Sequence, residues 1–193
     1  IWPLIYKDGR IIRCDQPGMP TEDCLFNDPF KTKVPLKIWN TSKGAGVVAA
    51  FNIFEGNETI RGSIGPKDVP NLIGEEFILF DVLTKKHWKL KKDEVINIEL
   101  AENGSSVYLL IPVKDSITPI GLINKFICNH GIENSWCTET GLKLTLKDSG
   151  VFAFLSEGQP LKATVNGEAI PIEVDAANQY IYTIDCQNIE GEV

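Results

Sequence analysis

The residues able to do chemistry are scattered along this 193-residue chain and form no recognisable catalytic motif. The two histidines, His87 and His130, lie far apart in sequence. A catalytic histidine needs a nucleophile and an acid partner within hydrogen-bond reach, and the sequence places neither beside it. We therefore expect His87 to be exposed at a strand end and His130 to be a loop residue. No Walker loop, dinucleotide-binding glycine fingerprint, Gly-x-Ser-x-Gly or His-Glu-x-x-His occurs.

The cysteines give no metal motif either. They are odd in number, irregularly spaced and contain no Cys-x-x-Cys: Cys14, Cys24, Cys128, Cys137 and Cys186. Together with the separated histidines, this pattern predicts no zinc site, and we expect no cofactor. Buried free thiols in a cytoplasmic protein are the expected state. A disulfide between Cys14 and Cys24, or between Cys128 and Cys137, is an open alternative, because spacing alone does not fix connectivity.

Carboxylates and tryptophans supply the other candidate chemistry. Glycosidases use two carboxylates, but with 26 Asp and Glu in the chain a pair can be chosen only from geometry. The tryptophans are Trp2, Trp39, Trp88 and Trp136, and such rings can stack on sugars in carbohydrate-binding modules. Trp39 lies in an apolar strand pattern, so we expect that ring in the core.

The bulk properties restrict the partners. The chain has the size of one domain, and its net charge of −7 argues against nucleic acid as a partner. The basic cluster at 85–92 is followed at once by two acidic residues and indicates a solvated hairpin end. Apolar runs are too short for a membrane span, and the run Ile1–Tyr6 ends in charged residues, unlike a signal peptide. A start at Ile1 suggests a processed chain or an excised fragment.

The pattern of elements predicts an all-β fold. Residues 1–35 are rich in Pro and should form an irregular lead-in, with Ile1–Tyr6 as a candidate helix end. From Leu36 onward, short apolar or alternating runs are separated by turn signals such as Asn103-Gly104 and Asn166-Gly167. Turns recur about every 8–12 residues, which is typical of an antiparallel two-sheet β-sandwich. Beyond Ile1–Tyr6, the one helix candidate is a turn at Pro66–Val69 capped by Ser63.

Six strings, in chain order, resemble the region after the catalytic barrel in glycoside hydrolase family 36, raffinose synthase (seed imbibition) and archaeal α-galactosidase type. The first is similar to Pro-Gly-Arg-Pro-Thr-Arg-Asp-Cys-Leu-Phe, but Met19 and Glu22 replace the arginines. The strings span nearly the whole chain: Pro17–Pro29, Leu36–Asn40, Gly46–Asn52, Ser63–Val69, Thr118–Phe126 and Gly150–Phe154.

This resemblance implies a domain division and a role. Residues 1–35 would be a connector and the tail of the barrel of the parent enzyme, with Ile1–Asp8 ending the last barrel helix. Residues 36–193 would be a C-terminal β-sandwich that stabilises this barrel. The parent would be a retaining α-galactosidase or galactosyl transferase whose catalytic aspartates lie outside this chain, so no catalytic residue is expected here. Thr21 and Asp23 would lie near the parent pocket, or would lock a capped turn.

Two alternatives remain at this point. A stand-alone carbohydrate-binding module would expose tryptophans in a row on one sheet face. A small self-sufficient hydrolase would place two carboxylates roughly 5–10 Å apart in a cleft. The accessory-domain hypothesis instead predicts an exposed apolar patch where the barrel docks.

Overall fold

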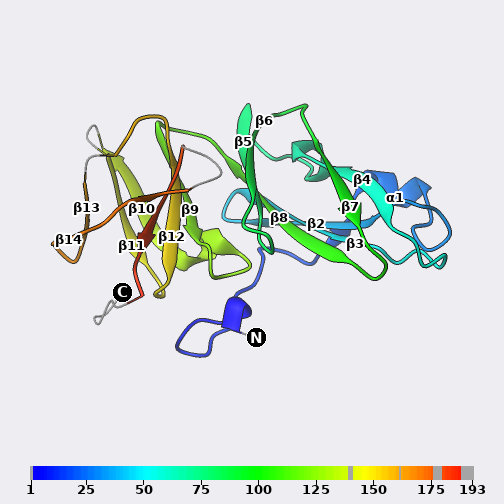
Figure 1. Cartoon of the computed structure of the whole chain (residues 1–193), viewed down its shortest axis with the longest axis horizontal. Helices are drawn as coiled ribbons and strands as arrows, with labels where there is room; N and C mark the ends of the chain where they lie inside the picture. The colour runs from blue at the N-terminus through cyan, green and yellow to red at the C-terminus, as the bar shows by residue number, and fades with distance from the viewer. Residues whose placement is uncertain (1, 139–140, 161, 176–179, 188–193) are drawn as a thin grey trace. The chain divides into compact units, whose positions relative to one another are not determined.

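The computed structural model describes residues 2–138, 141–160, 162–175 and 180–187. The chain folds as two compact units: unit 1 comprises Ile1–Arg13 and Lys114–Val193, and unit 2 comprises Cys14–Val113. Both consist of antiparallel strands with little helix (Figure 1). The predicted division between residues 35 and 36 does not coincide with either unit boundary, and it stays a prediction about domains.

Unit 2 is built on a six-stranded sheet in which every ladder is antiparallel. The spatial order of its strands is β1 (Met19–Pro20), β2 (Leu36–Ser42), β3 (Ala45–Phe51), β8 (Ser105–Pro112), β5 (Glu76–Asp81) and β6 (His87–Lys91). The short strand β1 forms an edge, where Pro20 removes no hydrogen bond that the sheet needs. Antiparallel pairing and most of these strands confirm the sequence prediction.

A second layer covers one face of that sheet. Strands β4 (Ile60–Ile64) and β7 (Ile96–Leu100) pair with each other, and their apolar residues share a buried core with the sheet strands. Ile60 and Ile98 from this layer meet Val48, Leu79 and Leu110 from the sheet. Unit 2 is therefore a two-layer β-sandwich, as predicted.

Unit 1 repeats this plan on a smaller scale. Its four-stranded sheet has the order β15 (Glu173–Val174), β16 (Ile181–Asp185), β12 (Val151–Ser156) and β9 (Ile117–Leu122). Strands β10 (Ile132–Thr138) and β11 (Gly141–Leu146) pair separately, as do β13 (Ala163–Val165) and β14 (Glu168–Ile170). The rings of Phe152 and Phe154 from β12 and Tyr182 from β16 stack in sequence on one another. Leu146 from β11 belongs to the same core.

The lead-in is more ordered than its proline content suggests. Trp2–Leu4 forms the 3-10 helix η1, and Ile5 pairs with Ile11. A helix end was predicted over Ile1–Tyr6, and the described residues of this range form only that short 3-10 helix. The α-helix α1 (Glu22–Phe26) was not predicted, because the surrounding prolines masked a single turn. Otherwise the lead-in is irregular, as expected.

Two further 3-10 turns lie in the described part of the chain: η2 (Pro66–Asp68) and η3 (Cys128–Gly131). The predicted turn at Pro66 is confirmed, but its N-cap is Gly65 rather than Ser63. The Asp68 carboxylate accepts the Gly65 amide at 2.9 Å, so a side chain within the turn satisfies the free N–H. The Asn166-Gly167 turn has positive φ at both residues, as a type I′ hairpin requires.

Candidate functional site

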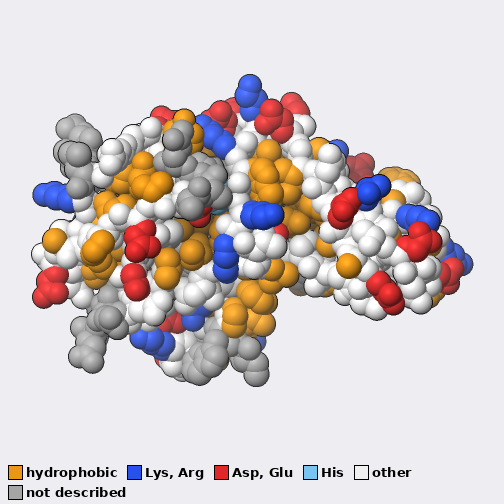
Figure 2. Space-filling model, in the orientation of Figure 1, with side chains coloured by type: hydrophobic (Ala, Val, Ile, Leu, Met, Phe, Trp, Pro, Cys, Tyr) orange, Lys and Arg blue, Asp and Glu red, His pale blue; other side chains and the backbone are white. Residues whose placement is uncertain are grey.

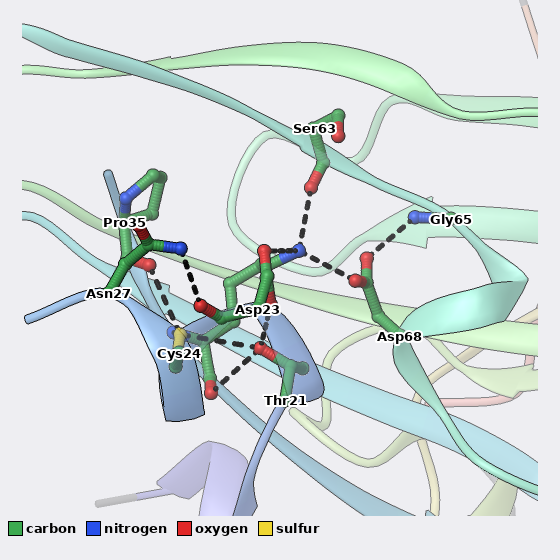
Figure 3. Close-up of polar contacts among 9 residues, drawn as sticks. Thr21, Asp23, Cys24, Asn27, Pro35, Ser63, Gly65 and Asp68 are labelled. Atoms are coloured by element: carbon green, nitrogen blue, oxygen red, sulfur yellow. Dashed lines mark hydrogen bonds and ion pairs between the residues drawn. The ribbon is translucent and has the colours of Figure 1, made fainter. Parts of the chain in front are cut away.

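Three of the strings that carry the resemblance meet at one ammonium group, that of Lys37 on β2. Its Nζ lies 2.8 Å from Asp23 Oδ2, 2.6 Å from Asp68 Oδ1 and 3.3 Å from the Ser63 carbonyl oxygen (Figure 3). An ammonium has three protons to donate, and these three acceptors account for all of them. We call these four residues the Lys37 node.

The node is buried on one side and open on the other. The side chains of Lys37 and Asp68 are 4% and 5% exposed, whereas that of Asp23 is 55% exposed. The ion cluster thus extends from the interior of unit 2, at Lys37 and Asp68, to its surface at Asp23. An ammonium buried so deeply would be strongly disfavoured without partners, and the two carboxylates supply the compensating charge.

The local sequence around α1 aims Asp23 at Lys37. Thr21 is 1% exposed and is the N-cap of α1, but its hydroxyl donates to Asp23 Oδ1 at 2.6 Å and accepts no hydrogen bond from a helix amide. The Thr21 amide donates to the Lys37 carbonyl at 3.0 Å. Asn27 donates from its side chain to the Asp23 carbonyl at 2.9 Å. The residues at both ends of α1 are therefore hydrogen-bonded to Asp23, Thr21 to its carboxylate and Asn27 to its main-chain carbonyl.

Cys24 ties the helix to β2 by a second route. Its Sγ accepts the Lys37 amide at 3.2 Å and approaches the Thr21 hydroxyl at 3.4 Å, and it lies 3.5 Å from the Pro35 carbonyl. The inward side of α1 thus consists of a thiol and a carboxylate. Packing of apolar residues is not what holds this helix, since none of its residues is buried.

The charges of the node reinforce one another. Burial by itself would raise the pKa of Asp23, but hydrogen bonds from Lys37 and Thr21 outweigh burial and lower this pKa. Burial would likewise lower the pKa of Lys37, yet hydrogen bonds to Asp23 and Asp68 raise it above its usual value. The pair stays charged at neutral pH, which suits a brace better than a proton donor or acceptor in catalysis.

Unit 1 contains a second buried Lys–Asp pair. Lys125 Nζ lies 2.7 Å from Asp148 Oδ2, with side chains 6% and 1% exposed. The same ammonium donates to the Ile5 carbonyl at 2.7 Å, and Asp148 accepts the Lys7 amide at 3.1 Å. The Phe126 amide also donates to the Pro3 carbonyl at 2.9 Å. This pair therefore fixes the first part of the lead-in, as the Lys37 node fixes the second.

The tryptophans and histidines that the sequence offered as candidates belong to neither of the two buried Lys–Asp pairs. Trp39 and Trp88 pack against the core of unit 2, as expected for Trp39, while Trp136 on β10 is 51% exposed. The side chain of Trp2 falls outside the described residues. His130 lies in η3, where its Nδ1 and carbonyl are each 3.0 Å from the Tyr6 hydroxyl. His87 lies at a strand end, as predicted, because it begins β6, but it is partly buried rather than exposed.

The thiols are free, as predicted, but only in part buried. Cys128 and Cys186 are buried, Cys14 and Cys24 are partly exposed, and Cys137 is exposed. Cys137 is on a strand with polar neighbours and donates to Asp115 at 3.2 Å. Within the described residues, no group of three or more His, Cys, Asp and Glu is placed to hold a metal ion.

Sequence reasoning singled out Thr21 and Asp23 and missed the residues that organise them. The structure brings both together beside Lys37 and Asp68, which had been read only as members of motif strings. One signal was available: Lys37 is a charged residue between Leu36 and Ile38 in an otherwise apolar strand. A lysine side chain is almost never fully buried unless it is paired with groups of opposite charge or with hydrogen-bond acceptors.

Comparisons with known proteins agree with the resemblance. A model of the family described as "Raffinose synthase or seed imbibition protein Sip1" matches residues 1–63. The chain is 26% identical, over 86% of its length, to galactinol–sucrose galactosyltransferase from Oryza sativa subsp. japonica. It is 27% identical, over 88% of its length, to stachyose synthase from Pisum sativum. The resemblance to the raffinose synthase type of glycoside hydrolase family 36 is thus confirmed.

The matched proteins are much longer than this chain. It covers 25% of the rice protein and 24% of the pea protein, so it spans about a quarter of the curated relatives it matches. Among solved structures, alpha-galactosidase I from Mortierella vinacea aligns over 50% of this chain and 23% of its own at 12% identity. The TM-score of 0.36 is too low for that likeness to carry an argument.

Proposed function

We propose that this chain is a non-catalytic C-terminal part of an enzyme that hydrolyses or transfers α-galactosides. Its role is to stabilise the catalytic barrel of the same polypeptide. The observation that carries this proposal is the Lys37 node: three resemblance strings meet in a buried, fully hydrogen-bonded ion cluster that anchors the lead-in. The ammonium and the carboxylates of the node are already paired with one another, so they are poorly suited to attack a sugar or transfer a proton.

The length of the relatives supports the proposal. The relatives named galactinol–sucrose galactosyltransferase and stachyose synthase are about four times longer than this chain, and a barrel requires roughly 250 residues. The first 63 residues, which match the family model, include the lead-in, β2 and every residue of the Lys37 node except Asp68. In the assembled enzyme the lead-in would face the barrel, with Asp23 adjacent to the parent pocket and Thr21 behind it as its hydrogen-bond donor.

The alternative hypothesis, a stand-alone carbohydrate-binding module, is less favoured. A row of exposed tryptophans was its expected sign, but Trp39 and Trp88 pack against the core of unit 2. Nucleic acid fits poorly as a partner, since Lys and Arg are intermingled with Asp and Glu on the face seen in Figure 2. No helix in the described part of the chain could span a membrane. Free thiols fit a reducing compartment, and a cytoplasmic location is part of the proposal.

The test is an assay of the purified 193-residue chain for release of 4-nitrophenol from its α-galactoside. A second assay follows galactosyl transfer from galactinol to sucrose, the reaction named for the relatives. We expect neither product above that of a heat-denatured sample. Turnover that disappears when one carboxylate is changed to its amide would overturn the proposal and place an active site within this chain.

A further inference from the structure

The outward side of α1 exposes large apolar residues on a fixed backbone. Leu25 and Phe26 are 65% and 82% exposed, and Phe30, four residues further on, is 49% exposed. Single exposed apolar residues are ordinary, but three within six residues, two of them on a helix with no buried residue, need an explanation. Met19 on β1 adds a fourth, at 50% exposure. We call these four residues the α1 ridge.

The fold turns the α1 ridge outward. A short helix on a free-standing domain would bury its apolar side chains and expose its polar ones. Here Cys24 and Asp23 face the protein and are held by Lys37, which leaves Leu25 and Phe26 on the other side. In the region where Figure 1 labels α1, Figure 2 shows hydrophobic side chains at the surface beside charged ones.

We infer that the α1 ridge is the surface by which unit 2 docks onto the catalytic domain of the same polypeptide, an inference that rests on the proposed function. The relatives are about four times longer than this chain, so most of such a protein is available as the occupant. Aromatic side chains in the centre of an interface typically anchor it by filling a pocket on the partner. Phe26 is the most exposed residue of the ridge and is its anchor.

Charge specifies the partner surface further. Glu22 and Asp23 lie in the first turn of α1, and no basic residue lies in its last turn. Near Phe30 the charge is mixed, since Asp28 and the exposed Lys31 lie on either side of it in sequence. The complementary surface is an apolar hollow with lysine or arginine where its rim meets Glu22. Because the Lys37 node already fixes the helix, docking loses little conformational entropy in α1.

The experiment compares Phe26→Asp with Ile73→Asp in the complete polypeptide that contains this chain. Ile73 is a matched control, since it is 86% exposed in the same unit but lies in the loop between η2 and β5. We expect Phe26→Asp to shorten the half-life of heat inactivation by at least about threefold, and Ile73→Asp to leave it unchanged. In the isolated chain, both variants should melt within about 2 °C of the wild type, because neither side chain is buried.

Equal half-lives for the two variants of the complete polypeptide would overturn the docking inference. The proposed function would survive that result, because it stands or falls with the absence of turnover by the isolated chain. Sedimentation velocity of the isolated chain tests the competing occupant, a second copy. A monomer at all concentrations supports docking onto the catalytic domain, and a dimer abolished by Phe26→Asp overturns it.

Discussion

Lys37 Nζ and Asp68 Oδ1 lie 2.6 Å apart, with both side chains almost fully withdrawn from solvent. Removing one partner of a buried pair leaves the other charge unpaired, which costs about 3–5 kcal/mol. We expect Lys37→Met to lower the free energy of unfolding by this amount in urea titrations of the isolated chain. Lys33→Met is the control, because Lys33 forms an exposed pair with Glu58 and should cost at most about 1 kcal/mol.

A double variant keeps this test informative if Lys37→Met does not fold. Combining it with Asp68→Asn removes the unpaired charge, so part of the lost stability should return. Equal costs for the buried and exposed lysines would show that the node contributes no more than a surface ion pair.

Asp23 gives a pH-dependent prediction. Its pKa in the folded chain is lowered from the ordinary value of 3.8, so its carboxylate contributes stability above that value. The contribution is lost as pH falls through the folded pKa. Asp23→Asn removes it, so wild type and variant should differ by a constant amount above about pH 5 and converge in strong acid.

The pair in unit 1 predicts a local change. Lys125 holds Ile5 by its carbonyl and orients Asp148 toward the Lys7 amide. Lys125→Met should release the first part of the lead-in and speed trypsin cleavage after Arg10 and Arg13. Lys143→Met, on the exposed side of β11, should leave the cleavage rate unchanged. If both variants are cut at the wild-type rate, the buried pair does not hold this segment.

A backbone contact predicts the strongest effect of a small substitution. Gly121 on β9 has φ of +115°, and a Cβ there would lie 2.2 Å from the Cys128 carbonyl oxygen. Both the conformation and the clash with backbone exclude alanine, so Gly121→Ala should abolish cooperative unfolding of unit 1 or lower its midpoint sharply. Gly158→Ala meets open space and should be neutral. Circular dichroism melts of the two variants distinguish these outcomes.

The strands that could be predicted from sequence are those with apolar runs or clear alternation, such as β3, β5 and β8. Outside the lead-in, three strands were not predicted, for identifiable reasons. Strand β9 contains Pro119, which argues against a central strand but is tolerated here because β9 lies at a sheet edge. Strand β10 is exposed along nearly its whole length and has no apolar face to detect. In β4, Gly62 weakens the pattern, yet it leaves the room that Pro35 occupies.

The candidate site could be predicted only in part. Thr21 and Asp23 stood out through a resemblance string, whereas Lys37 and Asp68 had no role until folding brought them together. Their separation of 31 residues along the chain carries no local signal. A buried ion cluster depends on tertiary pairing, which periodicity does not encode.

The most direct measurement of the central claim is the effect of Lys37→Met on the complete polypeptide. If the node braces an accessory domain, heat inactivation should be at least about tenfold faster while kcat/KM for an α-galactoside at 25 °C stays within about twofold of the wild type. A kcat/KM lowered tenfold or more, with unchanged heat stability, would contradict this account and assign Lys37 and its carboxylates to the active site.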